Sequence, residues 1–172
     1  NVLRCPYHSW AYDLNGKLIT TPHLGGMDKN ETEGFNKSKN GNTYDGGWKS
    51  NQMHGEGVYY FASRGEFYRG QYQNNLAHGR GIYTWLDGST YDGEYENGAK
   101  HGQGIETWPD YIYKGQYKNG KWNGFGITTY ANGSMYEGSF KDGYFDGEGT
   151  ITLPNGRSWA GRFLNGDISW PN

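Results

Sequence analysis

Cysteine, aliphatic side chains and long apolar runs are scarce in this chain of 172 residues. The single cysteine, Cys5, excludes an internal disulfide framework and fits a reducing compartment. Apolar residues make up only 33% of the sequence, and no run approaches the roughly 20 apolar residues that span a bilayer. No segment has the features of a secretory signal, so we predict a cytoplasmic location, with peripheral membrane or cytoskeletal association as an alternative. The chain begins at Asn1 without a methionine, so we expect a fragment or a processed piece.

An excess of charge of one sign is also missing. The chain has 16 basic and 18 acidic residues, a net charge of −2, which excludes a general electrostatic attraction to nucleic acid. Binding to anionic lipid requires clustered Lys and Arg, whereas acidic residues such as Asp92, Glu94 and Glu96 interrupt any basic stripe. A membrane lipid is therefore the weaker alternative as a partner, and no small-molecule substrate is evident.

Glycine and aromatic residues are abundant instead. The chain has 30 glycines, and Phe, Trp and Tyr make up 17% of it. An aromatic residue, a spacer and a glycine open a unit every 22 to 24 residues. The openings are Tyr44-Asp45-Gly46, Tyr68-Arg69-Gly70, Tyr91-Asp92-Gly93, Tyr113-Lys114-Gly115, Tyr136-Glu137-Gly138 and Trp159-Ala160-Gly161. Self-similarity at such a period indicates a folded array of supersecondary units, each unable to bury its apolar face alone.

Each unit is predicted to be a β-hairpin. In the unit that opens at Tyr68, residues 68–72 alternate with period two, and residues 82–85 are β-branched and aromatic, as in a returning strand. We predict that Gly79-Arg80-Gly81 ends the connecting turn and that Leu86-Asp87-Gly88 turns into the next unit. The glycine that follows each opening aromatic residue is expected to leave room for a ring from the next hairpin.

The repeated pattern of Tyr-x-Gly-x-aromatic, variable loop, Gly-x-Gly, short strand and Gly resembles the membrane occupation and recognition nexus (MORN) repeat. The resemblance covers residues 42–172, with five repeats and a partial sixth. It implies an all-β fold, an elongated single-layer array of antiparallel hairpins. It also implies protein–protein interaction or scaffolding through the concave face of the sheet, with a protein partner.

The first forty residues follow a different pattern. Cys5-Pro6-Tyr7-His8 is a Cys-x-x-His pair, and an aromatic-rich hairpin with an Asn15-Gly16 turn follows it. This segment resembles the second cluster-binding loop of a Rieske iron–sulfur domain of ring-hydroxylating oxygenases, although Ser9 stands where that family commonly has glycine. We therefore predict two units: residues 1–41, a small and incomplete β element, and residues 42–172, the array.

The Rieske resemblance implies that Cys5 and His8 are half of the ligand set of a 2Fe–2S cluster. Such a cluster needs two thiolates and two imidazoles, so it would require a further Cys-x-His loop upstream of Asn1. Three explanations of the segment stay open: a true fusion, a misjoined coding sequence near Gly41, or a coincidental likeness. These 172 residues alone are expected to hold no cofactor and to be no enzyme, because oxygenase chemistry would need the upstream and catalytic parts.

Six aromatic residues recur at matched positions of the repeats and are candidates for a partner-binding groove. They are Tyr72, Trp85, Tyr95, Trp108, Tyr117 and Tyr130. Aromatic side chains are favoured at interaction hot spots, because they bury a large area at low entropic cost. The alternative is that they form the core of an array with few aliphatic residues. We favour the core role, with both roles for rings at the edge of the groove.

Three histidines, His54, His78 and His101, each precede a Gly-x-Gly element, which raises the question of a metal site. Asn123 and Asp146 occupy the same position in later repeats, so the shared property is hydrogen bonding. We interpret the histidines as polar residues of a turn and predict no catalytic residues.

Overall fold

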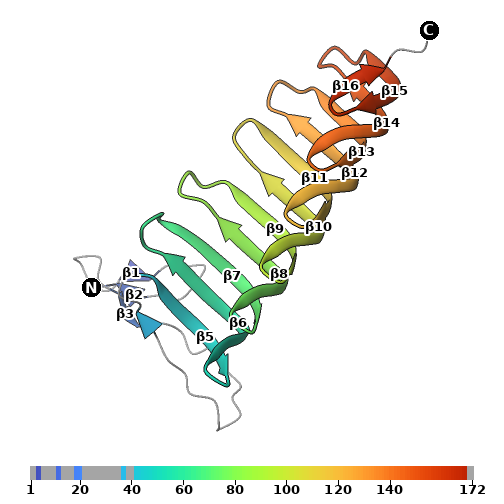
Figure 1. Cartoon of the computed structure of the whole chain (residues 1–172). Coiled ribbons are helices and arrows are strands. Elements are labelled where there is room, and N and C mark those ends of the chain that lie inside the picture. Colours follow the sequence, from blue (N-terminus) through green and yellow to red (C-terminus); the bar gives the residue numbers. More distant parts are fainter. Residues whose placement is uncertain (1–2, 5–10, 13–17, 21–35, 38–40, 170–172) are drawn as a thin grey trace. The chain divides into compact units, whose positions relative to one another are not determined.

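The computed structural model describes residues 3–4, 11–12, 18–20, 36–37 and 41–169, with side chains over residues 41–167 (Figure 1). The chain divides into two compact units, residues 1–31 and 32–172. In the first unit, β1 (Leu3–Arg4), β2 (Ala11–Tyr12) and β3 (Leu18–Thr20) form an antiparallel sheet in that order. The predicted cluster ligands Cys5 and His8 lie outside the described residues.

The second unit is one antiparallel sheet whose 13 described strands are paired in sequence order. Figure 1 shows β5 to β16 following one another along the array. The strands are β4 (Asn36–Lys37), β5 (Thr43–Lys49), β6 (Gln52–Phe61), β7 (Glu66–Gln73), β8 (Leu76–Thr84), β9 (Thr90–Glu96), β10 (Ala99–Thr107), β11 (Tyr111–Lys118), β12 (Lys121–Tyr130), β13 (Met135–Lys141), β14 (Tyr144–Thr152), β15 (Ser158–Leu164) and β16 (Asp167–Ser169). The predicted all-β hairpin array is confirmed. The sheet begins before the boundary expected at Gly41, because Asn36 in β4 is paired with Tyr44.

The turns within the hairpins are formed by pairs of residues with positive φ, mostly asparagine and glycine, and not by the Gly-x-Gly elements. Asn74 and Asn75, between β7 and β8, have positive φ angles of 52° and 69°. Gly79-Arg80-Gly81 lies inside β8, where Gly79 (φ 64°) accommodates a bulge. The prediction that Gly-x-Gly ends the turn is therefore wrong. A positive φ serves a bulge as readily as a turn, so glycine alone did not distinguish the two.

The glycines of both strands do make room for a ring, but the ring belongs to the same repeat. In the third repeat, Gly93 and Gly104 are register partners. A Cβ added at Gly104 would lie 2.5 Å from Cε2 of Tyr91, and one at Gly93 would lie 2.5 Å from the Tyr91 hydroxyl. The expectation of a ring from the next hairpin is wrong, because each tyrosine lies over the two glycines of its own hairpin.

The tyrosine hydroxyl also has a fixed partner. Tyr91 Oη donates a hydrogen bond to the carbonyl of Glu94, three residues later, at 2.8 Å. The same bond recurs in four other repeats, from Tyr44 to Gly47, Tyr68 to Gln71, Tyr113 to Gln116 and Tyr136 to Ser139, at 2.9 to 3.0 Å. The tyrosine ring over two glycines and the hydrogen bond of its hydroxyl therefore recur together along the sheet.

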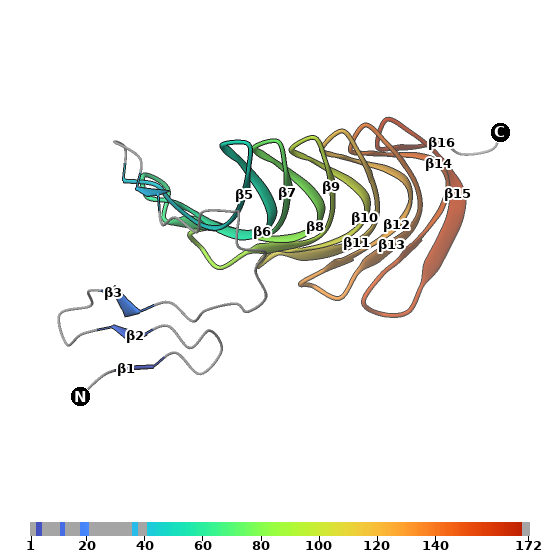
Figure 2. The same ribbon diagram turned by 90° about the horizontal axis from the view of Figure 1, so that it is seen from below.

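The core is a single layer of rings on one face of this sheet. Its buried members are Tyr44, Tyr68, Tyr72, Tyr91, Tyr95, Tyr113, Tyr117, Tyr136, Phe140 and Phe163. Successive rings meet edge to face, as where Tyr91 contacts Tyr117 at 4.9 Å between centroids, an arrangement that the aromatic quadrupole favours. Figure 2 shows that the strands are curved. Because aliphatic residues are few, stability depends on these ring contacts.

Candidate partner-binding face

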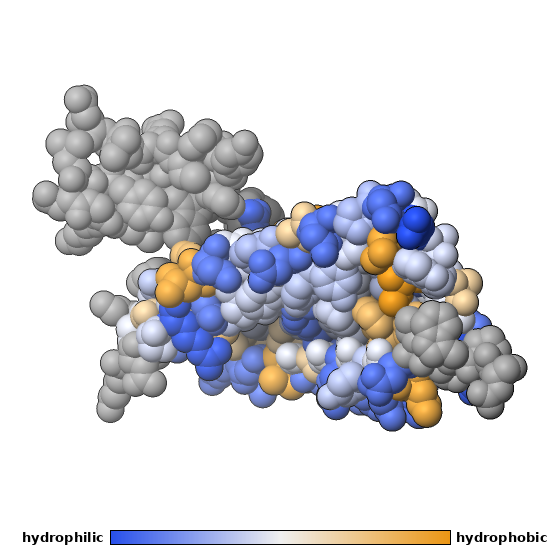
Figure 3. Space-filling view, turned by 90° about the horizontal axis from the view of Figure 1, so that it is seen from above, coloured by the Kyte–Doolittle hydropathy of each residue, from blue (hydrophilic) through white to orange (hydrophobic). Residues whose placement is uncertain are grey.

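Two faces of the array can be told apart by the burial of alternate residues. In β9, Tyr91, Gly93 and Tyr95 are buried and Asp92 is exposed, so we call the ring-bearing side the inner face and the opposite side the outer face. In β10, Glu106 is the register partner of Tyr91 and therefore lies on the inner face. In the space-filling view of Figure 3, pale side chains of intermediate hydropathy line a hollow that runs along the array.

Beside the buried core, five half-buried rings of the inner face form a continuous series, which we call the inner aromatic row. The row consists of Phe61, Tyr83, Trp85, Trp108 and Tyr111. Neighbouring centroids are 5.8, 5.0, 4.9 and 6.4 Å apart in that order. The rings come from β6, β8 and β11 and from the loops after β8 and β10, so the row runs across the strands. A half-buried ring series of this kind offers apolar surface without further rearrangement.

Two charged side chains contact rings of the row: Arg64 contacts Phe61 at one end, and Lys100 contacts Trp85 at the centre. Arg64 lies 5.6 Å from the Phe61 centroid, and its guanidinium is 3.7 Å from the Glu66 carboxylate. The Tyr83 hydroxyl donates a hydrogen bond to that carboxylate. Burial, followed by this hydrogen bond, raises the pKa of Tyr83 to about 12. Tyr83 is therefore neutral at physiological pH and its hydroxyl is already engaged.

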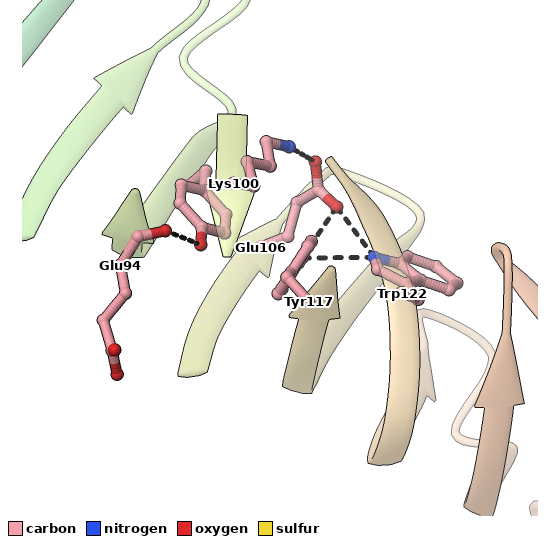
Figure 4. A network of polar contacts seen from close by, with 6 residues as sticks. Glu94, Lys100, Glu106, Tyr117 and Trp122 are labelled. Carbon is pink, nitrogen blue, oxygen red and sulfur yellow. Dashed lines mark hydrogen bonds and ion pairs between the residues drawn. The ribbon is translucent and has the colours of Figure 1, made fainter. Parts of the chain in front are cut away.

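An ion pair lies at the centre of the inner face, between Lys100 and Glu106 (Figure 4). The Lys100 ammonium is 2.5 Å from Glu106 Oε1, and the two side chains are only 20% and 9% exposed. The other carboxylate oxygen accepts hydrogen bonds from Tyr117 Oη at 3.0 Å and from Trp122 Nε1 at 3.1 Å. Every partner of the carboxylate thus donates to it, which a buried charge requires.

The ammonium of Lys100 also faces aromatic rings. It lies 4.7 Å from the Tyr91 centroid and 4.8 Å from the Trp85 centroid, within the range of cation–π attraction. Lys100 therefore joins the core tyrosines to the inner aromatic row. Without this lysine the two groups of rings would face an uncompensated Glu106 carboxylate.

This ion pair makes the stability of the array sensitive to acid. Burial alone would raise the pKa of the Glu106 carboxyl, but the hydrogen bond and the charge of Lys100, with the Trp122 indole N–H, hold it below its usual value of 4.5. A carboxyl with a lowered pKa in the folded state stabilises the fold above its unfolded pKa, and this contribution is lost as pH falls through the folded pKa.

We expect Glu106→Gln to lower the free energy of unfolding at pH 7 by about 3 kcal/mol, because it leaves Lys100 without its partner. Below pH 4.5 the wild-type protein should lose stability more steeply than the variant, as measured by urea unfolding at a series of pH values. The double variant Lys100→Met/Glu106→Thr should recover most of this lost stability, because it removes both charges together. Threonine stands at the position of Glu106 in the next repeat. Parallel pH curves for wild type and Glu106→Gln would contradict this account.

Sequence reasoning missed Lys100 and Glu106 as site residues, although alignment of the repeats carries the signal. The position of Lys100, two before the first glycine of Gly-x-Gly, holds Met53, Ala77, Trp122 and Phe145 in the other repeats. The position of Glu106, two after the second glycine, holds Tyr59, Tyr83, Thr128 and Ile151. Lys100 and Glu106 carry opposite charges, and both stand at positions that are uncharged in the other repeats. This combination predicts an ion pair between them.

The structure separates the six predicted groove residues into two sets. Tyr72, Tyr95 and Tyr117 are 7%, 7% and 3% exposed and lie in the core between the opening tyrosines. Their burial agrees with the core role that the sequence favoured, because almost no ring surface is left for a partner. Trp85 and Trp108 are half-buried and adjacent in the inner aromatic row, at 4.9 Å. Tyr130 is also half-buried and is the register partner of Tyr111.

The three histidines lie within strands and not in turns, since His54, His78 and His101 belong to β6, β8 and β10. Over residues 41–167, no group of three or more His, Cys, Asp and Glu side chains could hold a metal ion. The part of the chain that the structure describes also has no helix long and apolar enough to cross a membrane.

Comparison with known families agrees with the repeat geometry. The family model of the MORN repeat matches residues 44–66, 68–90, 91–111, 113–135 and 136–156, which is more than half of the chain. The chain therefore belongs to the MORN-repeat family. The model of the Rieske [2Fe-2S] domain matches residues 1–31.

Solved structures and curated sequences add less. The chain is similar to the structure titled SAS-4 (dCPAP) TCP domain in complex with a Proline Rich Motif of Ana2 (dSTIL) of Drosophila melanogaster, at 15% identity and a TM-score of 0.41. That match covers 83% of this chain and 96% of the other chain. No curated protein sequence matches the chain significantly.

The donor set of these 172 residues does not fit a complete Rieske cluster. Such a cluster takes two cysteine thiolates and two histidine imidazoles, and Cys5 is the only cysteine in the sequence. Cys5 and His8 supply one ligand of each kind, so half of the set is absent from these residues. No chemistry of the cluster follows from them alone.

Proposed function

We propose that the protein is a non-catalytic interaction module that binds an extended or helical segment of a protein partner along its inner face. The observation that carries this proposal is the inner aromatic row, a series of half-buried rings that crosses the strands of three successive repeats. Segments that lie across a repeat array contact one repeat after another, so affinity accumulates along the row.

The composition of the row supports a protein partner. Trp85 and Trp108, at its centre, are of the residue type most enriched among interaction hot spots. The row is flanked by fixed charges, Glu66 and Arg64 at one end and Lys100 at the centre, and such charges set the register of a bound segment more than its affinity. The inner face therefore combines apolar contact with charge-based selection.

The test is selection of random peptides by display on the full chain, followed by measurement of the affinity of the selected peptides in solution. Trp108→Ala should weaken their binding by about tenfold or more, as expected for a hot-spot tryptophan. Phe125→Ala is the matched control, because Phe125 is 54% exposed and lies on the outer face. Circular dichroism is used to check that both variants are folded. Peptides that bind both variants equally would refute the inner face as the binding surface.

A second candidate function, cluster binding by the Rieske-like segment, is favoured by the family match at residues 1–31. We propose that residues 1–41 and the array of residues 42–172 are separate functional units. Iron and acid-labile sulfide are measured in the same preparation as the peptide affinities. Stoichiometric iron and sulfide would support the cluster-binding function, whereas their absence together with peptide binding would leave the array as the working part.

A further inference from the structure

The outer face carries one row of side chains with an unusual order, and this row lies opposite the face used in the proposed function. We call it the central outer row. It follows the register partners across the strands: Asp45, Val58, Arg69, Ile82, Asp92, Ile105, Lys114, Ile127, Glu137 and Thr150. The first strand of each hairpin contributes a charged residue, and the returning strand contributes an aliphatic residue or threonine.

The charges in this row alternate in sign from one repeat to the next. Arg69, Asp92, Lys114 and Glu137 are all exposed, and among the described residues no ion pair includes any of the four. Successive charges are about 10 Å apart, because two strands separate them. Ile82 and Ile105, which lie between the charges, are 41% and 40% exposed. Unpaired charges and bare isoleucines in one line indicate a surface that has a partner.

Among arrangements with two-fold symmetry, this order is complementary to itself only when the two rows run in opposite directions. Two copies packed outer face to outer face, with their rows parallel and in register, would bring like charges together. A two-fold axis that is perpendicular to the row and passes through Ile105 reverses the second row. Asp92 then faces Lys114 of the partner subunit, and Arg69 faces Glu137 of the partner subunit.

The same axis also matches the apolar positions. Ile105 faces Ile105 of the partner subunit on the axis, and Ile82 faces Ile127 of the partner subunit. Each contact away from the axis occurs twice, as an isologous interface requires. Each charge of the four central repeats therefore faces a charge of opposite sign.

We propose that the chain forms an antiparallel two-fold dimer through the central outer row, with the axis at Ile105. The inner faces of both copies point away from the contact, so the dimer presents two partner-binding faces. The contact is a strip along one row and buries less than the roughly 800 Å² per partner of a standard interface. The association is therefore weak and sensitive to salt.

The test is analytical ultracentrifugation of the full chain over a concentration series, with charge-swapped variants. Asp92→Lys alone and Lys114→Asp alone should each lower the association constant by about tenfold or more, because like charges then face each other twice. The double variant should restore association to near the wild-type level. Lys118→Asp is the matched control, since Lys118 lies in β11 outside the row, and it should have little effect.

A cross-link keeps the proposal testable should a charge variant fail to fold. In a Cys5→Ser background, Ile105→Cys should form a disulfide-linked dimer on mild oxidation, whereas Lys118→Cys should not. A wild-type chain that stays monomeric throughout the series would overturn the proposal. So would a double charge swap that fails to restore association. Neither result bears on peptide binding by the inner face, so the two proposals fail separately.

Discussion

Gly115→Ala is expected to lower the free energy of unfolding by about 3 kcal/mol, because the added methyl group has no space. A Cβ at this position would lie 2.5 Å from the Tyr113 hydroxyl and 2.6 Å from the Cα of Gly126 in the neighbouring strand. Tyr113 is fully buried and its hydroxyl is held by the Gln116 carbonyl at 2.9 Å, so the ring cannot move aside without losing that bond. The loss corresponds to a melting temperature lower by roughly 6 to 12 °C.

The sixth opening provides a matched control for this substitution. Gly161 occupies the same place in the repeat and is the register partner of Gly149, but a Cβ there would have no neighbour within 4 Å. Gly161→Ala should leave stability unchanged or raise it by about 0.5 kcal/mol, since alanine restricts the unfolded chain. Equal melting temperatures for the two variants would show that ring packing is not why the opening glycine is needed.

Raising the pH above 10 is expected to unfold the array cooperatively. Burial is the largest cause that raises the pKa of seven core tyrosines well above the usual 10.0, and nearby carboxylates or tyrosines add to it. These are Tyr44, Tyr68, Tyr72, Tyr91, Tyr95, Tyr113 and Tyr117. A group whose pKa is raised in the folded state stabilises the fold fully below its unfolded pKa. That contribution is lost as pH rises towards the folded pKa.

The effect is large because the seven contributions act together. Each tyrosine that ionises only in the unfolded chain costs about 1.4 kcal/mol of stability per pH unit, so the seven cost about 10 kcal/mol at one unit above pH 10. This is comparable to the whole stability of an ordinary domain, so the midpoint should lie near pH 11. Near-ultraviolet absorbance of tyrosinate and circular dichroism should change in one coincident transition.

Variants of single tyrosines test the origin of this transition. Tyr113→Phe removes one ionisable group of the core and should reduce the pH dependence above pH 10 by about 1.4 kcal/mol per unit. Tyr144→Phe is the matched control, because Tyr144 lies outside the buried core and is 59% exposed. Gradual tyrosine ionisation without loss of the circular dichroism signal would mean that the rings titrate within the folded array.

The hairpin array itself was predictable, because its steric requirement is repeated in every unit. A ring over two glycines must recur wherever the hairpin recurs, so Tyr91-Asp92-Gly93 and its copies mark the period directly. The turns were not predictable in detail. Gly79 and Asn75 both adopt positive φ, and only strand register shows that the first is a bulge in β8 and the second a hairpin turn.

The candidate site was predictable in part. Trp85 and Trp108 were identified by their matched positions, and the structure brings them together in the inner aromatic row. Tyr72 and Tyr95 recur with the same regularity but are buried, since repetition marks a core position and an exposed position equally. Lys100 was missed as a site residue, because its ring contacts, Trp85 and Tyr91, lie outside its own strand and only folding brings them beside it.

The sequence by itself determined the repeat, the β-hairpin unit, the family and the change of pattern near Gly41, because each depends on residue type and spacing alone. The tertiary structure decided which rings are buried, how Glu106 is neutralised, and how Asp92 and Lys114 come to lie in one row of alternating charge. Those properties depend on strand register and on the direction of each side chain across the sheet. A shift of one residue in register would send every one of these side chains to the opposite face.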